Sequence, residues 1–586
     1  MTVQELQTLF TTHYNDTQMS RDEYGKMKKA FHNQLLSSDE VNDILKKGLA
    51  PETFNIFKAF LRMLQGYYSN VVNEFNVIAP SNELVPTATV VNGVIKSILQ
   101  QNRFTLLSEE VKLDGFLSGL FALEILPKDT GTTDEFGRPI IDIKMSNVPY
   151  DNLVLDYNVE QEDFSDITYL SIFKWVDKRV MLDTGFKEDE LEAYNNFLGI
   201  NEAQFTGSTD LTNKMKKYLL IQSFVKEDGK WYSYIWHNET IKEKNEIRDI
   251  PFVFTSLNRD TYNQVYGLFR EVYDAQINLN KAVIKLIEFS NTERIFVQEG
   301  AVGDIKKFEE KYKNMSKILP VTMIQGIKID QMTTEIQQQL MLAERALDRV
   351  QFVLGINDSF LGQAKASDSG RKVNLQRNSS IMRLRHIDRK LDIFFHILGE
   401  KTLDLIKKYY TSHRIVTIVE ENTMEQMFLE INKPLLTPEG QYIGWDEDKN
   451  DIKLLTLDGE VSNYPLVYDY TDMSQINFNL VVNAVNYDNE EERNQMVLET
   501  VLNGAIGQSL LTVNPSAYFE ISSMVVKQYK TKGSLRISQL LQQTAQMLSP
   551  QPQYQEQFGM GMMKGNQAGY KPSPKSANAN LEQGNA

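Results

Sequence analysis

A run of basic side chains is the strongest chemical signal in the sequence. Seven lysines and arginines fall within twenty residues in which only Asp388 is acidic: Arg371, Lys372, Arg377, Arg383, Arg385, Arg389 and Lys390. Lys365 comes just before them, in a segment rich in Gly, Ser, Asp and Ala. Cationic groups gathered in this way suit contact with phosphates. They would equally suit pairing with acids on a neighbouring helix or subunit, and the sequence leaves both interpretations open.

The sequence contains no motif of a nucleotide-driven or metal-dependent enzyme. It has no GxxxxGK[ST] loop, no HExxH pair and no GxSxG nucleophile elbow. Cysteine is absent, which excludes disulfides, thiolate metal sites and cysteine nucleophiles. Asp446, Asp448 and Asn450 imitate a calcium loop, but Asp451 and Leu457 stand where such a loop needs glycine and glutamate. We therefore predict a protein that is not an enzyme and that needs no cofactor or metal.

Composition indicates a large folded protein with an acidic surface. The chain has 586 residues, of which 41% are hydrophobic and 24% charged, and its formal net charge is −16. This length suggests roughly three to four domains or subdomains. The acidic balance argues against general coating of nucleic acid, but not against a surface that DNA passes without adhering. The N-terminus lacks a signal-peptide pattern and no run of about 18 apolar residues occurs, so we expect no membrane span.

Long helices must position the basic cluster. Two segments with apolar residues at steps of three and four predict two helices with narrow stripes. The stripes are Val265, Leu268, Val272, Ala275, Leu279, Ala282, Leu286 and Phe289, then Ile336, Leu340, Ala343, Leu347, Val350 and Leu354. At about 1.5 Å per residue, a first helix from Tyr262 would reach roughly 43 Å. Two such struts suit a spacer or channel wall, although an ordinary hairpin in a large core would show the same period.

The other segments alternate between helical and β-rich stretches, so the fold class is α+β. Residues 1 to about 126 are expected to be mostly helical, and Asp228-Gly229 predicts a hairpin turn within a β-rich part that follows Arg138. Further expected elements are short strands around a charged helix at 294–332, a third long helix at 371–410, strands at 414–482 and helices at 488–502 and 535–548. From Ser549 the chain lacks Ile and Val, which predicts a disordered or partner-ordered tail.

This order resembles that of the portal, or head-to-tail connector, proteins of short-tailed double-stranded DNA bacteriophages. The resemblance covers about residues 50 to 545 and rests on order and loose motifs. The residues that carry it are Val148-Pro149 with Asn152, Asp156, Asp163, Asp166 and Trp175; Gly267 to Lys281 with Arg270, Asp274, Gln276 and Asn280; Ser369-Gly370-Arg371 with Gln376; and Phe478 to Val482 before the acidic segment from Asp488.

The resemblance implies a multi-subdomain portal fold with a helical and β-rich wing, a helical stem hairpin, a small α/β clip and a helical crown. The implied boundaries are 1–258 for the wing, 259–292 for the first stem helix, 293–333 for the clip, 334–357 for the second stem helix, 358–372 for a tunnel loop, 373–487 for the rest of the wing, 488–548 for the crown and 549–586 for the tail.

The resemblance also implies a ring oligomer, of twelve subunits, that forms the DNA channel at one capsid vertex. Such a ring serves genome packaging, retention, tail attachment and ejection, in the virion and, during assembly, in the host cytoplasm. The implied partners are the major capsid protein, the terminase large subunit, tail or head-completion proteins at 293–333, and double-stranded DNA, with no membrane. The candidate DNA contacts are Lys365, Arg371, Lys372 and Arg377. The alternatives are a helical internal virion or scaffolding protein without a channel and, as a third class, a nuclease with a carboxylate metal site.

Overall fold

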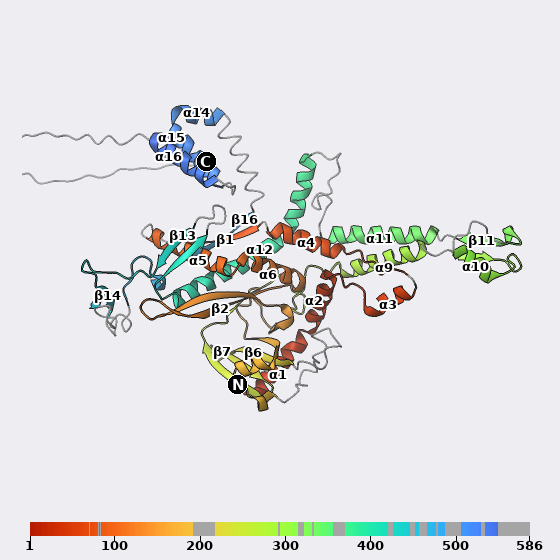
Figure 1. Ribbon diagram of the computed structural model, residues 1–586, viewed down its shortest axis with the longest axis horizontal. Coiled ribbons are helices and arrows are strands. Elements are labelled where there is room, and N and C mark those ends of the chain that lie inside the picture. Colours follow the sequence, from red (N-terminus) through yellow and green to blue (C-terminus); the bar gives the residue numbers. More distant parts are fainter. Residues whose placement is uncertain are drawn as a thin grey trace, which may run out of the picture. The chain divides into compact units, whose positions relative to one another are not determined.

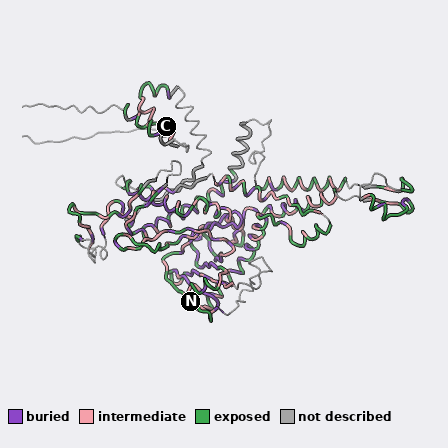
Figure 2. The backbone as a smooth tube through the Cα atoms, viewed as in Figure 1, coloured by how far each residue is buried: buried purple, intermediate pink, exposed green. Residues whose placement is uncertain are grey.

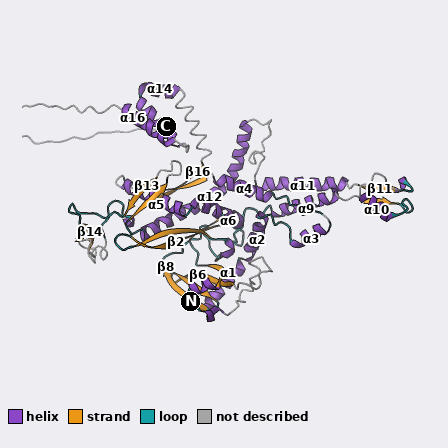
Figure 3. Ribbon diagram, in the orientation of Figure 1, coloured by secondary structure: helices purple, strands orange, loops and turns teal. Residues whose placement is uncertain are grey.

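The computed structural model divides the chain into two compact units, Met1–Arg493 and Asn494–Ala586. The residues that it describes are 1–47, 49–69, 71–79, 81, 84–191, 217–290, 294–313, 321–330, 333–354, 370–419, 426–445, 452–455, 466–475, 479–486, 505–528 and 534–548. Helices and strands both contribute extensively to the first unit, as Figure 3 shows, so the α+β prediction is confirmed.

The helices of the first unit follow local sequence signals. Two begin at capping boxes, formed by Thr2 with Glu5 and by Ser37 with Glu40, in which each side chain satisfies a backbone N–H of the first turn. The helices, labelled in Figure 1 where there is room, are α1 Val3–Asp16, α2 Gln18–Phe31, α3 Ser38–Lys46, α4 Ile56–Ser69, α5 Val85–Gln101, α6 Phe104–Ser118, α7 Lys178–Asp183, α9 Tyr273–Ser290, α10 Ile305–Lys313, α11 Thr333–Leu354 and α12 Gly370–Tyr409.

Two larger antiparallel sheets lie in the first unit. One has the order β3-β2-β9 and the other the order β4-β5-β6-β7-β8. Asp228 and Gly229 join β6 to β7 with φ values of 49° and 81°, which confirms the predicted hairpin turn. No sequence pattern predicts β8, whose residues are mostly polar. The strands are β2 Leu120–Thr133, β3 Pro139–Asn147, β4 Leu153–Leu155, β5 Tyr169–Asp177, β6 Lys217–Glu227, β7 Lys230–His237, β8 Thr240–Ile247 and β9 Phe252–Ser256.

Four two-stranded sheets complete the strands described in this unit. In one of them, β1 and β16 join distant parts of the chain, with Val71 opposite Asn486 and Ile78 opposite Asn479. Strand β1 lies in a part of the chain that is predicted to be mostly helical. The pairs are β1 Val71–Ile78 with β16 Asn479–Asn486, β10 Arg294–Val297 with β11 Ile327–Asp330, β12 Arg414–Val419 with β13 Gln426–Ile431, and β14 Tyr442–Trp445 with β15 Ile452–Leu455.

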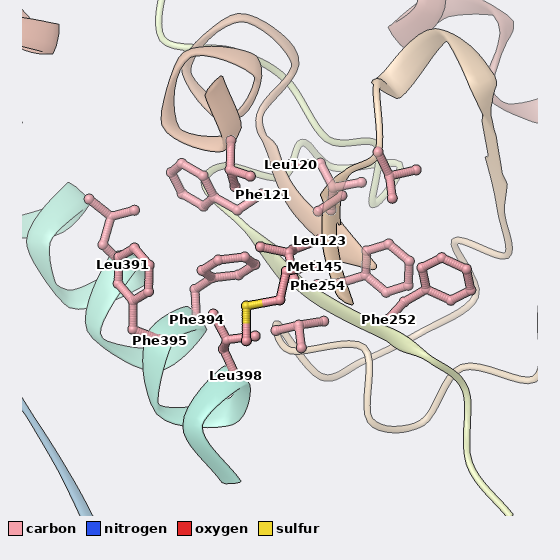
Figure 4. Close-up of a cluster of buried hydrophobic side chains, with 14 of the residues drawn as sticks. Leu120, Phe121, Leu123, Met145, Phe252, Phe254, Leu391, Phe394, Phe395 and Leu398 are labelled. Atoms are coloured by element: carbon pink, nitrogen blue, oxygen red, sulfur yellow. The ribbon is translucent and has the colours of Figure 1, made fainter. Parts of the chain in front are cut away.

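A shared hydrophobic core fixes the second half of α12 against the β3-β2-β9 sheet. Phe394 and Leu398 on the helix and Leu123 on β2 are fully buried. Burial of each such side chain contributes about 1.5–3 kcal/mol. Figure 4 shows the contributing side chains, which are Leu391, Phe394, Phe395 and Leu398 from α12, Leu120, Phe121 and Leu123 from β2, Met145 from β3, and Phe252 and Phe254 from β9. The core therefore holds α12 at a set position in this unit.

The first predicted long helix is shorter than the sequence suggests. It begins at Tyr273 instead of Tyr262 and has 18 residues, so it spans about 27 Å. Val265 and Val272 are buried as the stripe requires, but they lie in an irregular segment. The helical prediction for 262–272 is therefore wrong. The spacing of the apolar residues correctly indicates which side chains are buried, but it does not determine the backbone conformation.

A close crossing of two backbone segments explains this irregular stretch. Gly119, which ends α6, has φ of 85°, and a Cβ added there would lie 2.1 Å from the Tyr266 carbonyl oxygen. A Cβ added to Gly267 would lie 2.2 Å from the Leu117 carbonyl oxygen. Real Cβ atoms do not approach backbone so closely, so both positions need glycine. The chain at 266–268 is held against the α6–β2 junction and cannot continue α9 backwards.

The paired helices α9 and α11 lie side by side, with β10, α10 and β11 at their far end (Figure 1). The predictions of α11, α12 and a strand–helix–strand insert are confirmed, although a short 3₁₀ turn, Ile324–Gly326, replaces the first part of the second strand. All side chains of α11 are described, and of its 22 residues only Val350 is buried, in agreement with the intermediate and exposed colours of Figure 2.

The second unit contains α14 Ala505–Val513, α15 Pro515–Gln528 and α16 Ser534–Leu548 among its described residues. The last helix confirms the prediction for 535–548. Serines let α15 and α16 pack closely, with the Ser523 and Ser538 hydroxyl oxygens 2.9 Å apart. The predicted helix at 488–502 and the tail at 549–586 lie outside the described residues. None of the described helices in either unit combines the length and hydropathy that crossing a bilayer requires.

Candidate nucleic-acid interface

The basic cluster lies in the first half of α12. The backbone of Arg371, Lys372 and Arg377 is helical, as predicted, but their side chains lie outside the described part of the structure. Lys365 lies outside the described residues altogether. Contact between these four cations and DNA therefore stays a prediction.

One cation of the cluster is committed to an ion pair within the chain. The Lys390 side chain is 10% exposed and its ammonium group contacts the carboxylate of Glu162, which lies between β4 and β5. A buried ammonium without a partner would be costly, so this pair fixes the side chain. For Lys390, the structure supports pairing with an acid over contact with a phosphate.

The acid and the histidine beside the cluster are also held by other elements. The Tyr68 hydroxyl of α4 donates to Asp388 over 2.8 Å, and burial raises the pKa of the Asp388 carboxyl. His386 Nε2 lies 3.0 Å from the side-chain oxygen of Asn258. These contacts hold the middle of α12 against α4 and against the segment that follows β9.

Arg385 and Arg389 differ from their neighbours because they point into solvent. Both are exposed, they lie one helical turn apart, and neither forms a salt bridge with a residue that the structure describes. They are not among the four predicted contact residues, although their spacing of four was visible in the sequence. Exposed arginines can contact phosphates through paired N–H groups, so they extend the candidate surface.

A metal-dependent reaction centre finds no support in the described part of the chain. No group of three or more His, Asp or Glu side chains there lies close enough together to hold a metal ion. The described surface of α12 thus offers cations without a metal-binding cluster among the described residues beside them.

Comparison with known proteins agrees with the arrangement of helices and strands. The model of the phage P22-like portal protein family matches residues 7–586. A curated protein of Helicobacter pylori bacteriophage KHP30, named "Portal protein", is 21% identical over 439 residues, which cover 72% of this chain and 69% of the relative. The family is a structural one, so the scaffolding and nuclease alternatives give way to the expected portal function. The chain therefore belongs to the phage P22-like portal protein family and serves as a phage portal protein of the capsid.

Proposed function

We propose that copies of the chain close into a ring at one capsid vertex and that double-stranded DNA passes through the ring. The observation that supports this most is the exposure of α11. Its apolar side chains Leu340, Met341 and Leu342 are 49%, 52% and 53% exposed. A helix with so little buried surface has faces left for a partner. Heterologous contacts between identical chains generate a closed ring when the rotation fits, and the family resemblance favours twelve subunits.

Electron microscopy of the purified chain tests the ring directly. We expect closed rings, and counting their rotational symmetry should give twelve. A monodisperse monomer at the concentrations used for assembly, with no rings at capsid vertices, would contradict the proposal.

Within the ring, we assign each segment the role that the resemblance implies. Residues 259–292 and 334–357 are the stem, although its first helix proper starts at Tyr273, and 293–333 form a clip for tail or head-completion proteins. Residues 1–258 and 373–487 form the wing beside the major capsid protein, 358–372 a tunnel loop, 488–548 a crown and 549–586 a tail. The terminase large subunit drives packaging, and assembly takes place in the host cytoplasm.

DNA contact is assigned to the tunnel loop and the start of α12. The variant Lys365→Gln, Arg371→Gln, Lys372→Gln should fold and form rings but package or retain less DNA. Each solvent-screened contact contributes about 0–1 kcal/mol, but the contacts recur in every subunit. The measurement is the DNA content of purified capsids, compared with that of wild type.

A matched control removes three cations elsewhere. Lys128, Lys144 and Lys174 are exposed on the two larger sheets, and their change to Gln should leave DNA content unchanged. Normal packaging and retention in the first variant would remove the proposed contact. Failure of that variant to assemble would instead favour pairing of these cations with acids, as seen for Lys390.

A further inference from the structure

The helix α11 carries opposite charges on two flanks. Glu344 and Asp348 lie one turn apart on one flank, and Arg345 and Arg349 lie one turn apart on the other, offset by about 100°. All four side chains are exposed, and none forms a salt bridge with any residue in the described ranges. Charges of both signs are therefore available on one helix.

An apolar residue accompanies each charged flank. Leu340 lies one turn before Glu344 and is 49% exposed, while Leu342 lies one turn before Arg345 and is 53% exposed. Burial of both leucines would stabilise any contact that also pairs the charges. Each flank thus has the composition of half of a helix–helix interface.

The basic flank faces a groove between α3, α9 and α11, with a volume of about 680 Å³. Arg345, Arg349 and Leu342 line one wall, and Lys281 and Lys285 of α9 add positive charge. The groove is open to solvent, so side chains of another molecule can enter it.

The acids that line the same groove are engaged by groups of this chain, and the Glu40 carboxylate accepts hydrogen bonds from the backbone N–H and the hydroxyl of Ser37. Lys47 pairs with Glu288 over 3.0 Å, and Lys46 pairs with Asp43 over 3.2 Å. Arg345 and Arg349 of α11, like Lys281 and Lys285 of α9, line the groove without a salt bridge to an acid that the structure describes. An incoming acidic surface would therefore complete the charge balance.

We propose that the acidic flank of α11 in one copy lies in the groove of the next copy. Glu344 and Asp348 of the first copy then face Arg345 and Arg349 of the second, and Leu340 packs near Leu342. Because one helix supplies both surfaces at different angles, the contact runs head to tail and repeats around a ring. This inference rests on the proposed ring and names the surfaces that close it.

A nucleic acid is a poorer occupant of this groove. Glu40, Asp43 and Glu288 line it together with the cations, and carboxylates repel phosphates. DNA in the groove would also leave Glu344 and Asp348 without partners. A second copy of the chain satisfies both sets of charges.

Two charge-reversal variants test the contact. In Glu344→Arg, Asp348→Arg both flanks are positive, and in Arg345→Glu, Arg349→Glu both are negative. We expect each variant alone to lose at least tenfold in ring yield, because like charges then meet at every interface. An equimolar mixture should recover rings of alternating copies, which twelve positions allow. Native mass spectrometry and electron microscopy measure composition and closure, and thermal unfolding of each variant checks folding.

The control variant Glu239→Arg, Glu243→Arg makes the same change in net charge as Glu344→Arg, Asp348→Arg. Its positions are exposed, one just before β8 and one within it, and it should form rings normally.

If both flank variants form rings alone while wild type does too, the inference is wrong and the proposed ring stands. If folded variants fail alone and also fail when mixed, charge pairing is wrong. Rings of the Arg345→Glu, Arg349→Glu variant that close but lose DNA would assign the groove to DNA instead. Absence of wild-type rings would overturn the proposed function itself.

Discussion

Replacing Gly119 with alanine should destabilise the chain more than most single substitutions. The residue has a left-handed backbone, which costs an L-residue roughly 1–2 kcal/mol. The new Cβ would also lie 2.1 Å from the carbonyl oxygen and 2.6 Å from the backbone nitrogen of Tyr266. Backbone atoms cannot swing aside as a flexible side chain can. We expect a total loss on the order of 4 kcal/mol, measured as a fall in denaturant midpoint and soluble yield.

Gly131→Ala provides a matched control for this effect. Gly131 has φ of 73°, but nothing lies within 4 Å of a Cβ built there. It should therefore show the cost of the left-handed backbone alone. Equal losses at both positions would mean that the crossing of the α6–β2 junction with residues 266–268 relaxes freely and does not constrain the fold.

Raising the pH from 8 to about 10.5 should stabilise the chain through Lys112. This side chain is 5% exposed, and its ammonium group donates to the Tyr68 carbonyl oxygen over 3.0 Å near the end of α4. Burial lowers the pKa of Lys112 to about 8, from an ordinary value of 10.5. Between these values the unfolded chain binds the additional proton, so the free energy of unfolding rises with pH. The full effect is roughly 3 kcal/mol.

Lys112→Met isolates this contribution. The variant should lose the rise between pH 8 and 10.5, since a thioether does not titrate. Burial raises the pKa of tyrosines such as Tyr24 and Tyr68, so they ionise near pH 10 only in the unfolded chain and oppose the Lys112 effect. The quantity to measure is therefore the difference between wild type and variant in urea unfolding at each pH. Lys128→Met, at an exposed position, should keep the wild-type slope. A parallel pH profile for wild type and Lys112→Met would contradict the expected titration.

Strong local patterns made much of the fold predictable. The helix α12 has forty residues without an internal proline, and the strand–helix–strand insert between α9 and α11 has clear changes of period. The stripe at Val265 and Val272 led to a wrong helix prediction, because an irregular segment can bury apolar residues at the same spacing as a helix does. The residue that decides between helix and irregular segment is Gly267. It must lack a side chain because its backbone lies against that of Leu117, 150 residues earlier in the sequence.

The candidate site was predictable as a composition but not as an arrangement. The sequence shows seven cations together, yet Lys390 is engaged by Glu162 from a distant loop, while Arg385 and Arg389 remain exposed. No local rule connects residues 162 and 390. Strand β8 could not be predicted for a related reason. Its partner β7 supplies the buried apolar residues of this part of the sheet, so β8 itself contains few apolar residues.

The pairing of β1 with β16 has a consequence for the timing of synthesis. The paired residues are roughly 400 positions apart. A ribosome adds about 5–20 residues per second, so β1 waits about 20–80 seconds before its partner emerges. During this interval the backbone N–H and C=O groups of β1 are unpaired. They can form hydrogen bonds with a strand of another chain unless a chaperone shields them. This sheet is therefore completed only after Asn486 of the 586 residues has been added, and products of earlier termination lack the strand that would pair with that edge.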